Sequence, residues 1–171
     1  MIKNLRTLLF LAGFTATVLS ACGPTAPPAQ APTGGNLESD SKIIQGKVTG
    51  TKVGAKTMVA LSGSFLNLGG NKIDAQNNTI TEDQVLATAP VVDGKYNFSL
   101  PKAPSKANTA ANLKMFVFND DNGNKTFDAN ETKSKDAQIR YVVGFGYQSG
   151  RDSEGNEVLF SEFKDFNFTL D

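Results

Sequence analysis

The sequence predicts an all-β domain, an antiparallel β-sandwich of about seven strands within residues 42–171. In this region short apolar runs alternate with stretches rich in Gly, Asn, Asp and Ser. Where a hydrophobic period can be read it is two, which is the period of a β-strand. After its start, the run 113–118 is apolar on both faces, as expected for a central strand that a second sheet covers. Short strands separated by turns favour two packed antiparallel sheets.

The strands are expected in the following order. Two apolar runs interrupted by glycines open the domain, at residues 43–48 and 58–61. Residues 71–81 are polar and loop-like, and residues 81–86 suit either a capped short helix or the start of a strand. The later strands are predicted at residues 95–100, 113–118, 139–147 and 166–170.

The predicted strand 139–147 contains a row of large side chains at alternate positions. One face carries Tyr141, Val143, Phe145 and Tyr147. Glycines occupy positions 144 and 146 on the other face, which indicates a bend or a close backbone contact. The row is typical of a buried core face, and an aromatic ligand patch is the alternative.

The clearest turn signal is the pair Asp93-Gly94, which provides the positive φ of a tight turn. After it, Tyr96, Phe98 and Leu100 alternate with polar residues, so one face of this strand should be buried and the other wet. The segment 91–101 resembles a segment of the carboxypeptidase-regulatory-like and transthyretin-like β-sandwich domains of secreted bacterial proteins. This resemblance implies an immunoglobulin-like or transthyretin-like sandwich.

Residues 1–21 have the layout of a secretory signal. Lys3 and Arg6 precede an uncharged apolar run, residues 8–18, which is too short to span a bilayer as a stable helix. The run ends in Leu19-Ser20-Ala21-Cys22, which resembles the lipobox of bacterial lipoproteins. Cys22 is the only cysteine in the chain, so an ordinary signal peptide beside an incidental cysteine is the weaker alternative.

The lipobox resemblance implies cleavage before Cys22, a diacylglyceryl and acyl lipid on its thiol, and attachment to a membrane outside the cytoplasm. Gly23 stands where an aspartate would resemble an inner-membrane retention signal, which implies the outer membrane or cell surface if the host has two membranes. Residues 22–41 follow as a tether. Four of the seven prolines fall within it, so an extended spacer of about 3 Å per residue is expected.

The charge balance argues against nucleic acid as a partner. Removal of Lys3 and Arg6 with the signal leaves 15 of the 17 basic residues against 17 acidic residues. No basic cluster is present in the sequence, whereas binding to a phosphate backbone needs one.

Residues 120–131 have the spacing of an EF-hand-type calcium loop. Oxygen-bearing side chains occupy positions 1, 3, 5, 9 and 12 of that loop, Thr126 occupies the backbone-carbonyl position 7, and Phe127 occupies the apolar position 8. Calcium requires a shell of hard oxygen ligands. The candidate ligands are Asp120, Asn122, Asn124, Thr126, Asp128 and Glu131.

Two features depart from the usual loop. Gly123 is at position 4 and Lys125 at position 6, where a glycine normally makes the sharp turn. A strand enters the loop instead of a helix, so residues 115–131 resemble the calcium loops of SdrD-B-like adhesin domains and dockerin-like modules. Only Asp120, Asp128 and Glu131 are charged ligands, which favours a weak site suited to extracellular calcium. The ion is expected to make the loop rigid and to perform no chemistry. An Asx-rich turn without metal is the alternative.

No catalytic set is recognised, and the protein is expected not to be an enzyme. The chain contains no histidine, and its only thiol is assigned to the lipid. Two Ser-x-x-Lys sequences, at residues 39–42 and 161–164, lack the companion motifs of penicillin-binding enzymes. The favoured function is a non-catalytic structural or interaction module that binds an envelope protein or glycan. The alternative is a small-ligand or carbohydrate carrier that uses Tyr141, Phe145 and Tyr147.

Overall fold

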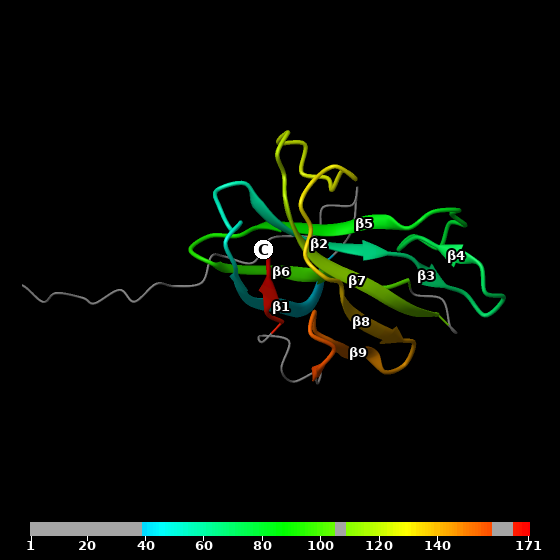
Figure 1. Cartoon of the computed structure of the whole chain (residues 1–171). Coiled ribbons are helices and arrows are strands. Elements are labelled where there is room, and N and C mark those ends of the chain that lie inside the picture. Colours follow the sequence, from blue (N-terminus) through cyan, green and yellow to red (C-terminus); the bar gives the residue numbers. More distant parts are fainter. Residues whose placement is uncertain (1–38, 105–108, 159–165) are drawn as a thin grey trace, which may run out of the picture.

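The structure is a computed structural model that describes residues 39–104, 109–158 and 166–171 (Figure 1). These ranges contain no helix, and the predicted all-β class is confirmed. Among the described residues seven strands have six residues or more. The strands are β1 (Ser39–Thr49), β2 (Thr57–Gly63), β3 (Phe65–Leu66), β4 (Lys72–Ile73), β5 (Gln84–Pro90), β6 (Lys95–Pro101), β7 (Ala110–Asn119), β8 (Ala137–Val142), β9 (Gly146–Arg151), β10 (Glu157–Val158) and β11 (Phe168–Thr169).

The strands form two sheets. The small sheet has the order β11-β1-β6, and the large sheet has the order β10-β9-β8-β7-β2-β5, with β3 and β4 attached at the start of β7. All pairs are antiparallel except β1 with β11, which is parallel. In Figure 1 the last strand, β11, lies beside β1. The chain passes from the large sheet to the small one between β5 and β6.

One hydrophobic core lies between the sheets. The small sheet contributes Ile44, Phe98 and Phe168, and the large sheet contributes Val59 and Leu113, all buried in one cluster. Apolar area of this kind is the main driving force of folding. The Tyr147 hydroxyl of β9 links the two sheets, because it donates to the carbonyl of Pro101 on β6. The Tyr96 hydroxyl donates to the carbonyl of Phe166 at 2.7 Å and holds the chain end against the small sheet. Burial raises the pKa of both phenols.

The predicted turn before β6 is confirmed. Asp93 and Gly94 have φ of 50° and 67°, the signs that a two-residue type I′ hairpin requires. Val92 and Lys95 exchange both backbone hydrogen bonds across it, at 2.8 and 2.9 Å. Tyr96, Phe98 and Leu100 then point into the core, as predicted.

The chain end also follows its predicted pattern, because Phe166, Phe168 and Leu170 are all buried. It packs so closely on β1 that a Cβ at Gly46 would lie 1.8 Å from the carbonyl oxygen of Phe166. Only glycine fits at that position.

The prediction of a single strand over residues 139–147 is wrong. The chain reverses there, so β8 and β9 form a hairpin in which Tyr141 pairs with Tyr147. Gly144 and Gly146 have φ of 80° and 75° in this turn, and glycine adopts such angles without steric cost. The bend that the glycines indicated is therefore a full turn.

Smaller differences concern the first half of the domain. Residues 81–86 lead into β5 without a helix, which settles that alternative in favour of the strand. The loop-like segment 71–81 contains the short β4 and a bridge between Ile73 and Thr79. The Ser-x-x-Lys sequence at 39–42 lies within β1, whereas the one at 161–164, the signal and the lipobox with Cys22 lie outside the described residues.

Candidate functional site

The loop 120–131 projects beyond the end of β7 (Figure 1). Its two ends are held together by the β-structure beneath it. The amide of Asn119 donates to the carbonyl of Thr132 at 3.1 Å, and Phe118 and Lys133 form a bridge. The amide of Asp120 donates to the carbonyl of Lys56 at 3.0 Å. The loop is therefore closed at its base before any ligand is considered.

The first and last carboxylates of the loop are more enclosed than the residues between them. Asp120 and Glu131 are 6% and 7% exposed, whereas residues 121–126 are all exposed. No lysine or arginine in the described chain forms an ion pair with Asp120, Asp128 or Glu131. A buried carboxylate without a compensating cation is costly, so these groups would gain from a bound cation.

Asp120 contains the one carboxylate oxygen of the loop that is buried without a partner. Its Oδ2 atom accepts the amide of Lys125 at 3.0 Å, whereas Oδ1 accepts no hydrogen bond from the described residues. Each such orphaned buried atom in a native fold requires an explanation. A metal ion at position 1 of the loop would provide one.

Glu131 closes the other end of the loop. Its Oε1 atom accepts the amide of Asp121 at 2.9 Å, and its Oε2 atom accepts the amide of Asp128 at 3.0 Å. Both carboxylate oxygens are thus oriented by backbone donors. Orientation of this kind reduces the entropy that a ligand must lose on binding.

The side chains of Asn122 and Asn124 converge on Asp128. Their amide nitrogens donate to Asp128 Oδ2 at 2.7 and 2.9 Å. Their oxygens accept backbone amides, those of Asn124 and Thr126, at 3.0 and 2.8 Å. Three of the predicted ligands, Asn122, Asn124 and Asp128, are therefore brought together, and the two amides provide hydrogen-bond donors to the Asp128 carboxylate. A cation would compete with these amide donors for Asp128.

Lys125 adopts the backbone conformation that glycine normally provides at position 6. Its φ is 61°, and Gly123 at position 4 has φ of 78°. A non-glycine residue in this region costs roughly 1–2 kcal/mol. Lys125 at position 6 thus raises the conformational free energy of the turn but keeps the positive φ that the turn requires.

Phe127 attaches the loop to the outer face of the large sheet. Its ring lies 5.3 Å from that of Phe116 and 5.9 Å from that of Phe118, both edge-to-face. The Lys133 ammonium lies 4.3 Å from the centre of the Phe116 ring. β7 lies inside the large sheet, as predicted for a central strand. The second sheet covers only its inner face, whereas Phe127 covers the outer apolar face, so a second sheet does not account for both faces.

Two other loops show how this chain builds a metal-free Asx turn. In one, Asp74 Oδ1 accepts two backbone amides at 2.8 and 2.9 Å, and Oδ2 accepts the Asn78 amide group at 2.9 Å. Asp152 makes the same contacts with residues 154 and 156. Burial alone would raise the pKa of Asp74, but the hydrogen bonds from Asn78 and Gln76 outweigh it and lower this pKa. Both carboxylates are fully satisfied, unlike Asp120.

Carboxylates alone do not make a metal site in this loop. Within the described ranges, no group of three His, Cys, Asp or Glu side chains is gathered closely enough to hold a metal ion. A calcium site therefore needs neutral oxygens from Asn122, Asn124 and Thr126 as well as the carboxylates. Calcium accepts such mixed ligands, since amide and carbonyl oxygens commonly complete its shell. The donor set fits calcium on its chemistry.

The aromatic row proposed as a ligand patch does not form one surface. Tyr147 is buried in the core, Tyr141 is half-buried against it at 5.1 Å between ring centres, and Phe145 is 78% exposed at the β8–β9 turn. The three side chains therefore differ in exposure and do not share one surface. The prediction of a buried core face is correct for Tyr147.

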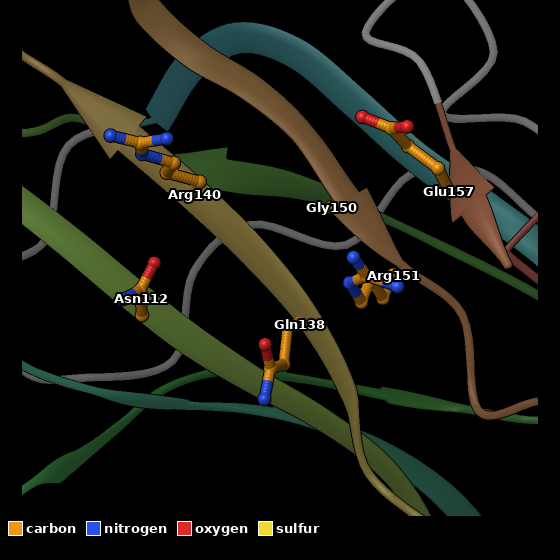
Figure 2. Close-up of a pocket in the computed structure, with 6 residues that line it drawn as sticks. All are labelled: Asn112, Gln138, Arg140, Gly150, Arg151 and Glu157. Carbon is orange, nitrogen blue, oxygen red and sulfur yellow. The ribbon is translucent and has the colours of Figure 1, made fainter. Parts of the chain in front are cut away.

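A polar hollow lies instead on the outer face of β7 to β10 (Figure 2). It has a volume of about 210 Å³ and is lined by Asn112, Gln138, Arg140, Gly150, Arg151 and Glu157. A second hollow of about 240 Å³ shares Asn112 and Arg140 with it. These residues form no motif in the sequence, and only their alternation with buried neighbours along β7 and β8 indicates that they share one face.

Other residues of the loop site could not have been found from the sequence. Lys56 Nζ donates to the carbonyl of Asp121 at 2.6 Å across 65 positions of sequence. Asn119 holds the loop base, because its side chain accepts the Thr57 hydroxyl at 2.8 Å and donates to the carbonyl of Lys52 at 3.1 Å. Such contacts depend on strand pairing and carry no local motif.

Comparison of the chain with models of known families, with curated proteins and with solved structures finds no match. The resemblances to transthyretin-like domains, to adhesin calcium loops and to the lipobox therefore stay predictions. In the described part of the chain, no helix is long and apolar enough to cross a membrane.

Proposed function

We propose that the protein is a membrane-anchored extracytoplasmic lipoprotein whose β-sandwich is a non-catalytic interaction module stabilised by calcium at residues 120–131. The lipid on Cys22 would provide the anchor, and a tether that ends where β1 begins, residues 22–38, would hold the domain away from the bilayer. Calcium would be a structural ion, since the candidate ligands leave no open catalytic position.

The observation that carries the calcium proposal is the state of the Asp120 carboxylate. It is buried, one of its oxygens has no hydrogen-bond donor in the described structure, and no cation pairs with it. In the two Asx loops of the same chain, every carboxylate oxygen of Asp74 and Asp152 has a donor. The contrast favours a ligand at the first loop and none at the other two.

The test is thermal unfolding of the purified protein in excess EDTA and in millimolar calcium. Calcium at a hundredfold excess over its dissociation constant would stabilise the fold by about 2.7 kcal/mol. For a domain of this size that is roughly 10 °C in melting temperature. Magnesium at the same concentration should give a smaller shift, because it demands a tighter octahedral shell.

Three variants make the test specific. Asp120→Asn and Asp128→Asn each keep the side-chain size and should abolish most of the calcium-dependent shift. Asp74→Asn, in an Asx loop of the same kind, should keep the full shift. Equal melting temperatures in EDTA and calcium for the unaltered protein would disprove the calcium site. A shift that survives in Asp120→Asn would place the ion elsewhere.

A further inference from the structure

The outer face of the large sheet carries a row of polar side chains that runs across four strands. Cross-strand pairing places Lys114 beside Gln138, Gln138 beside Arg151 and Arg151 beside Glu157. Asn112 pairs with Arg140 in the neighbouring row. Directly opposed side chains on one face lie about 5 Å apart. The sheet register, which the core fixes, therefore sets the spacing of these polar groups.

Neither arginine of this face forms an ion pair with a described residue, although Glu157 lies opposite Arg151 and lines the same hollow. Arg140 makes no hydrogen bond or ion pair with any described residue, and Arg151 donates only to the backbone carbonyl of Gly155 at 3.2 Å. Both side chains are exposed. Guanidinium groups bind carboxylates in a planar, two-pronged geometry. Two guanidinium groups against the single carboxylate of Glu157 leave the hollow with a net positive charge, which is complementary to an anion.

The two amide side chains that line the same hollow, Asn112 and Gln138, can bind hydroxyl groups of a ligand. Asn112 and Gln138 line the same hollow as the two arginines (Figure 2). A side-chain amide both donates and accepts hydrogen bonds, as a sugar hydroxyl requires from its partner. Gly150 also lines the hollow, and a Cβ there would lie 1.7 Å from the carbonyl oxygen of Gln138. No larger residue can therefore replace Gly150, and the hollow stays open at this position.

The shape favours an extended ligand over a compact one. Each hollow, at about 210 and 240 Å³, is smaller than the roughly 300–1,000 Å³ of a pocket for a drug-sized molecule. The two hollows meet at Asn112 and Arg140, and the second contains the half-buried ring of Tyr141. A chain of small units, each with hydroxyl groups and some with a carboxylate, matches this arrangement.

The two hollows that share Asn112 and Arg140 are together called the trough. We propose that the trough binds an acidic oligosaccharide, with its carboxylates on the guanidinium groups of Arg140 and Arg151 and its hydroxyls on Asn112 and Gln138. This inference deepens the proposed function, because it names an acidic glycan as the partner of the interaction module. It uses no residue of the loop 120–131. Binding at the trough therefore does not require calcium at that loop.

The experiment is calorimetric titration of the full chain, purified in detergent, with a hyaluronan hexasaccharide at low and physiological salt. The neutral control sugar is a hexasaccharide of N-acetylglucosamine. The acidic sugar should bind at least tenfold more tightly than the neutral one. Arg140→Gln and Arg151→Gln should each weaken its binding about tenfold, which corresponds to about 1.4 kcal/mol. Arg140→Lys should show an intermediate loss, because lysine keeps the charge without the two-pronged geometry.

The matched control is Lys47→Gln, which removes an exposed positive charge from the small sheet. Its affinity should stay within twofold of the unaltered protein. The melting temperatures of all variants should agree with that of the unaltered protein, since exposed side chains contribute little to stability. Equal losses in Lys47→Gln and Arg140→Gln would reduce the effect to diffuse charge and overturn the proposal.

Other outcomes also decide the question. No binding of the acidic sugar, or equal binding of the neutral one, would overturn the inference. Vesicles with phosphatidylglycerol that bind in place of the sugar, and lose binding in Arg140→Gln, would replace the glycan by a membrane surface. Repeating the titration in EDTA separates the two proposals. Sugar binding without calcium-dependent melting would support the trough and reject the calcium loop. Calcium-dependent melting without sugar binding would support the calcium loop and reject the trough.

Discussion

Replacement of Phe127 by alanine tests whether the loop 120–131 and the sheet act as one unit. The Phe127 ring is half-buried and contacts the rings of Phe116 and Phe118 edge-to-face. A fully buried Phe→Ala substitution costs about 3–5 kcal/mol, and each aromatic pair adds roughly 0.5–1.5 kcal/mol beyond area burial. For a half-buried ring with two partners, we expect a loss of about 2–3 kcal/mol in the free energy of unfolding.

The same substitution should weaken calcium binding if the proposed site is correct. Phe127 lies between Thr126 and Asp128, both candidate ligands, so its packing fixes their backbone. A coupling of about 1–2 kcal/mol between packing and binding would raise the calcium dissociation constant roughly five- to thirtyfold. Denaturant unfolding in EDTA measures the first effect, and calorimetric calcium titration measures the second.

The control is Phe145→Ala, the same substitution at a ring that is 78% exposed. It should change stability by less than about 0.5 kcal/mol and leave calcium affinity unchanged. A Phe127→Ala variant that loses stability but binds calcium within twofold of the unaltered protein would refute the coupling. Retained stability in EDTA would refute the packing argument itself.

Three further predictions concern single positions. Lys125→Gly should raise the melting temperature in EDTA by the equivalent of about 1 kcal/mol or less, since glycine relieves the positive φ at a cost in unfolded-state entropy; a lower melting temperature would contradict the strain at φ of 61°. Cys22→Ser should abolish incorporation of a labelled palmitate analogue and release the protein from the membrane fraction, whereas Ser20→Ala should keep both, and membrane retention of Cys22→Ser would disprove the lipid anchor. Hydrogen bonds hold the pKa of Asp74 and Asp152 below 3.8 despite the opposing effect of burial, so their contribution to stability is complete above the unfolded value and is lost as the pH falls through the folded values. Asp74→Asn with Asp152→Asn should flatten the fall of unfolding free energy below pH 3.8, and an unchanged slope would exclude these groups.

Features with local causes could be predicted from the sequence. The turn at Asp93-Gly94 follows from the residues themselves, because few pairs accept two positive φ values. The burial of Tyr96, Phe98 and Leu100 follows from alternation on one strand. The hydrogen bonds within residues 120–131 are also local, and the spacing in the sequence indicated that Asn122, Asn124 and Asp128 would lie together.

Features that depend on turns inside a hydrophobic pattern could not be predicted. Tyr141, Val143, Phe145 and Tyr147 alternate as one strand would, yet the chain reverses at Gly144. The period of two continues through the turn because the hairpin returns Tyr147 opposite Tyr141. Only the backbone angles of the glycines separate the two interpretations, and the sequence does not contain them.

Contacts between distant strands set the remaining features. Arg140 and Arg151 flank one hollow because β8 pairs with β9 in a defined register. A shift of that register by one residue would turn one of these side chains toward the core. The apolar outer face of β7 likewise gains its cover from Phe127, nine positions beyond Phe118 in the sequence. No local sequence motif predicts either contact, because each depends on how the strands of the sheet pair.

The outer face of β7 carries both proposed sites, one after the other. Asn112 lies at the trough, and Phe116 and Phe118 lie under the loop residue Phe127. Strand residues rise about 3.4 Å each, so the six positions from Asn112 to Phe118 span about 20 Å. Backbone pairing continues along this length, with β8 on residues 110–115 and β2 on residues 114–119, so the strand does not bend freely. Calcium at the loop would thus hold one end of a fixed surface while a glycan occupies the other, and each site can fill without deforming the other.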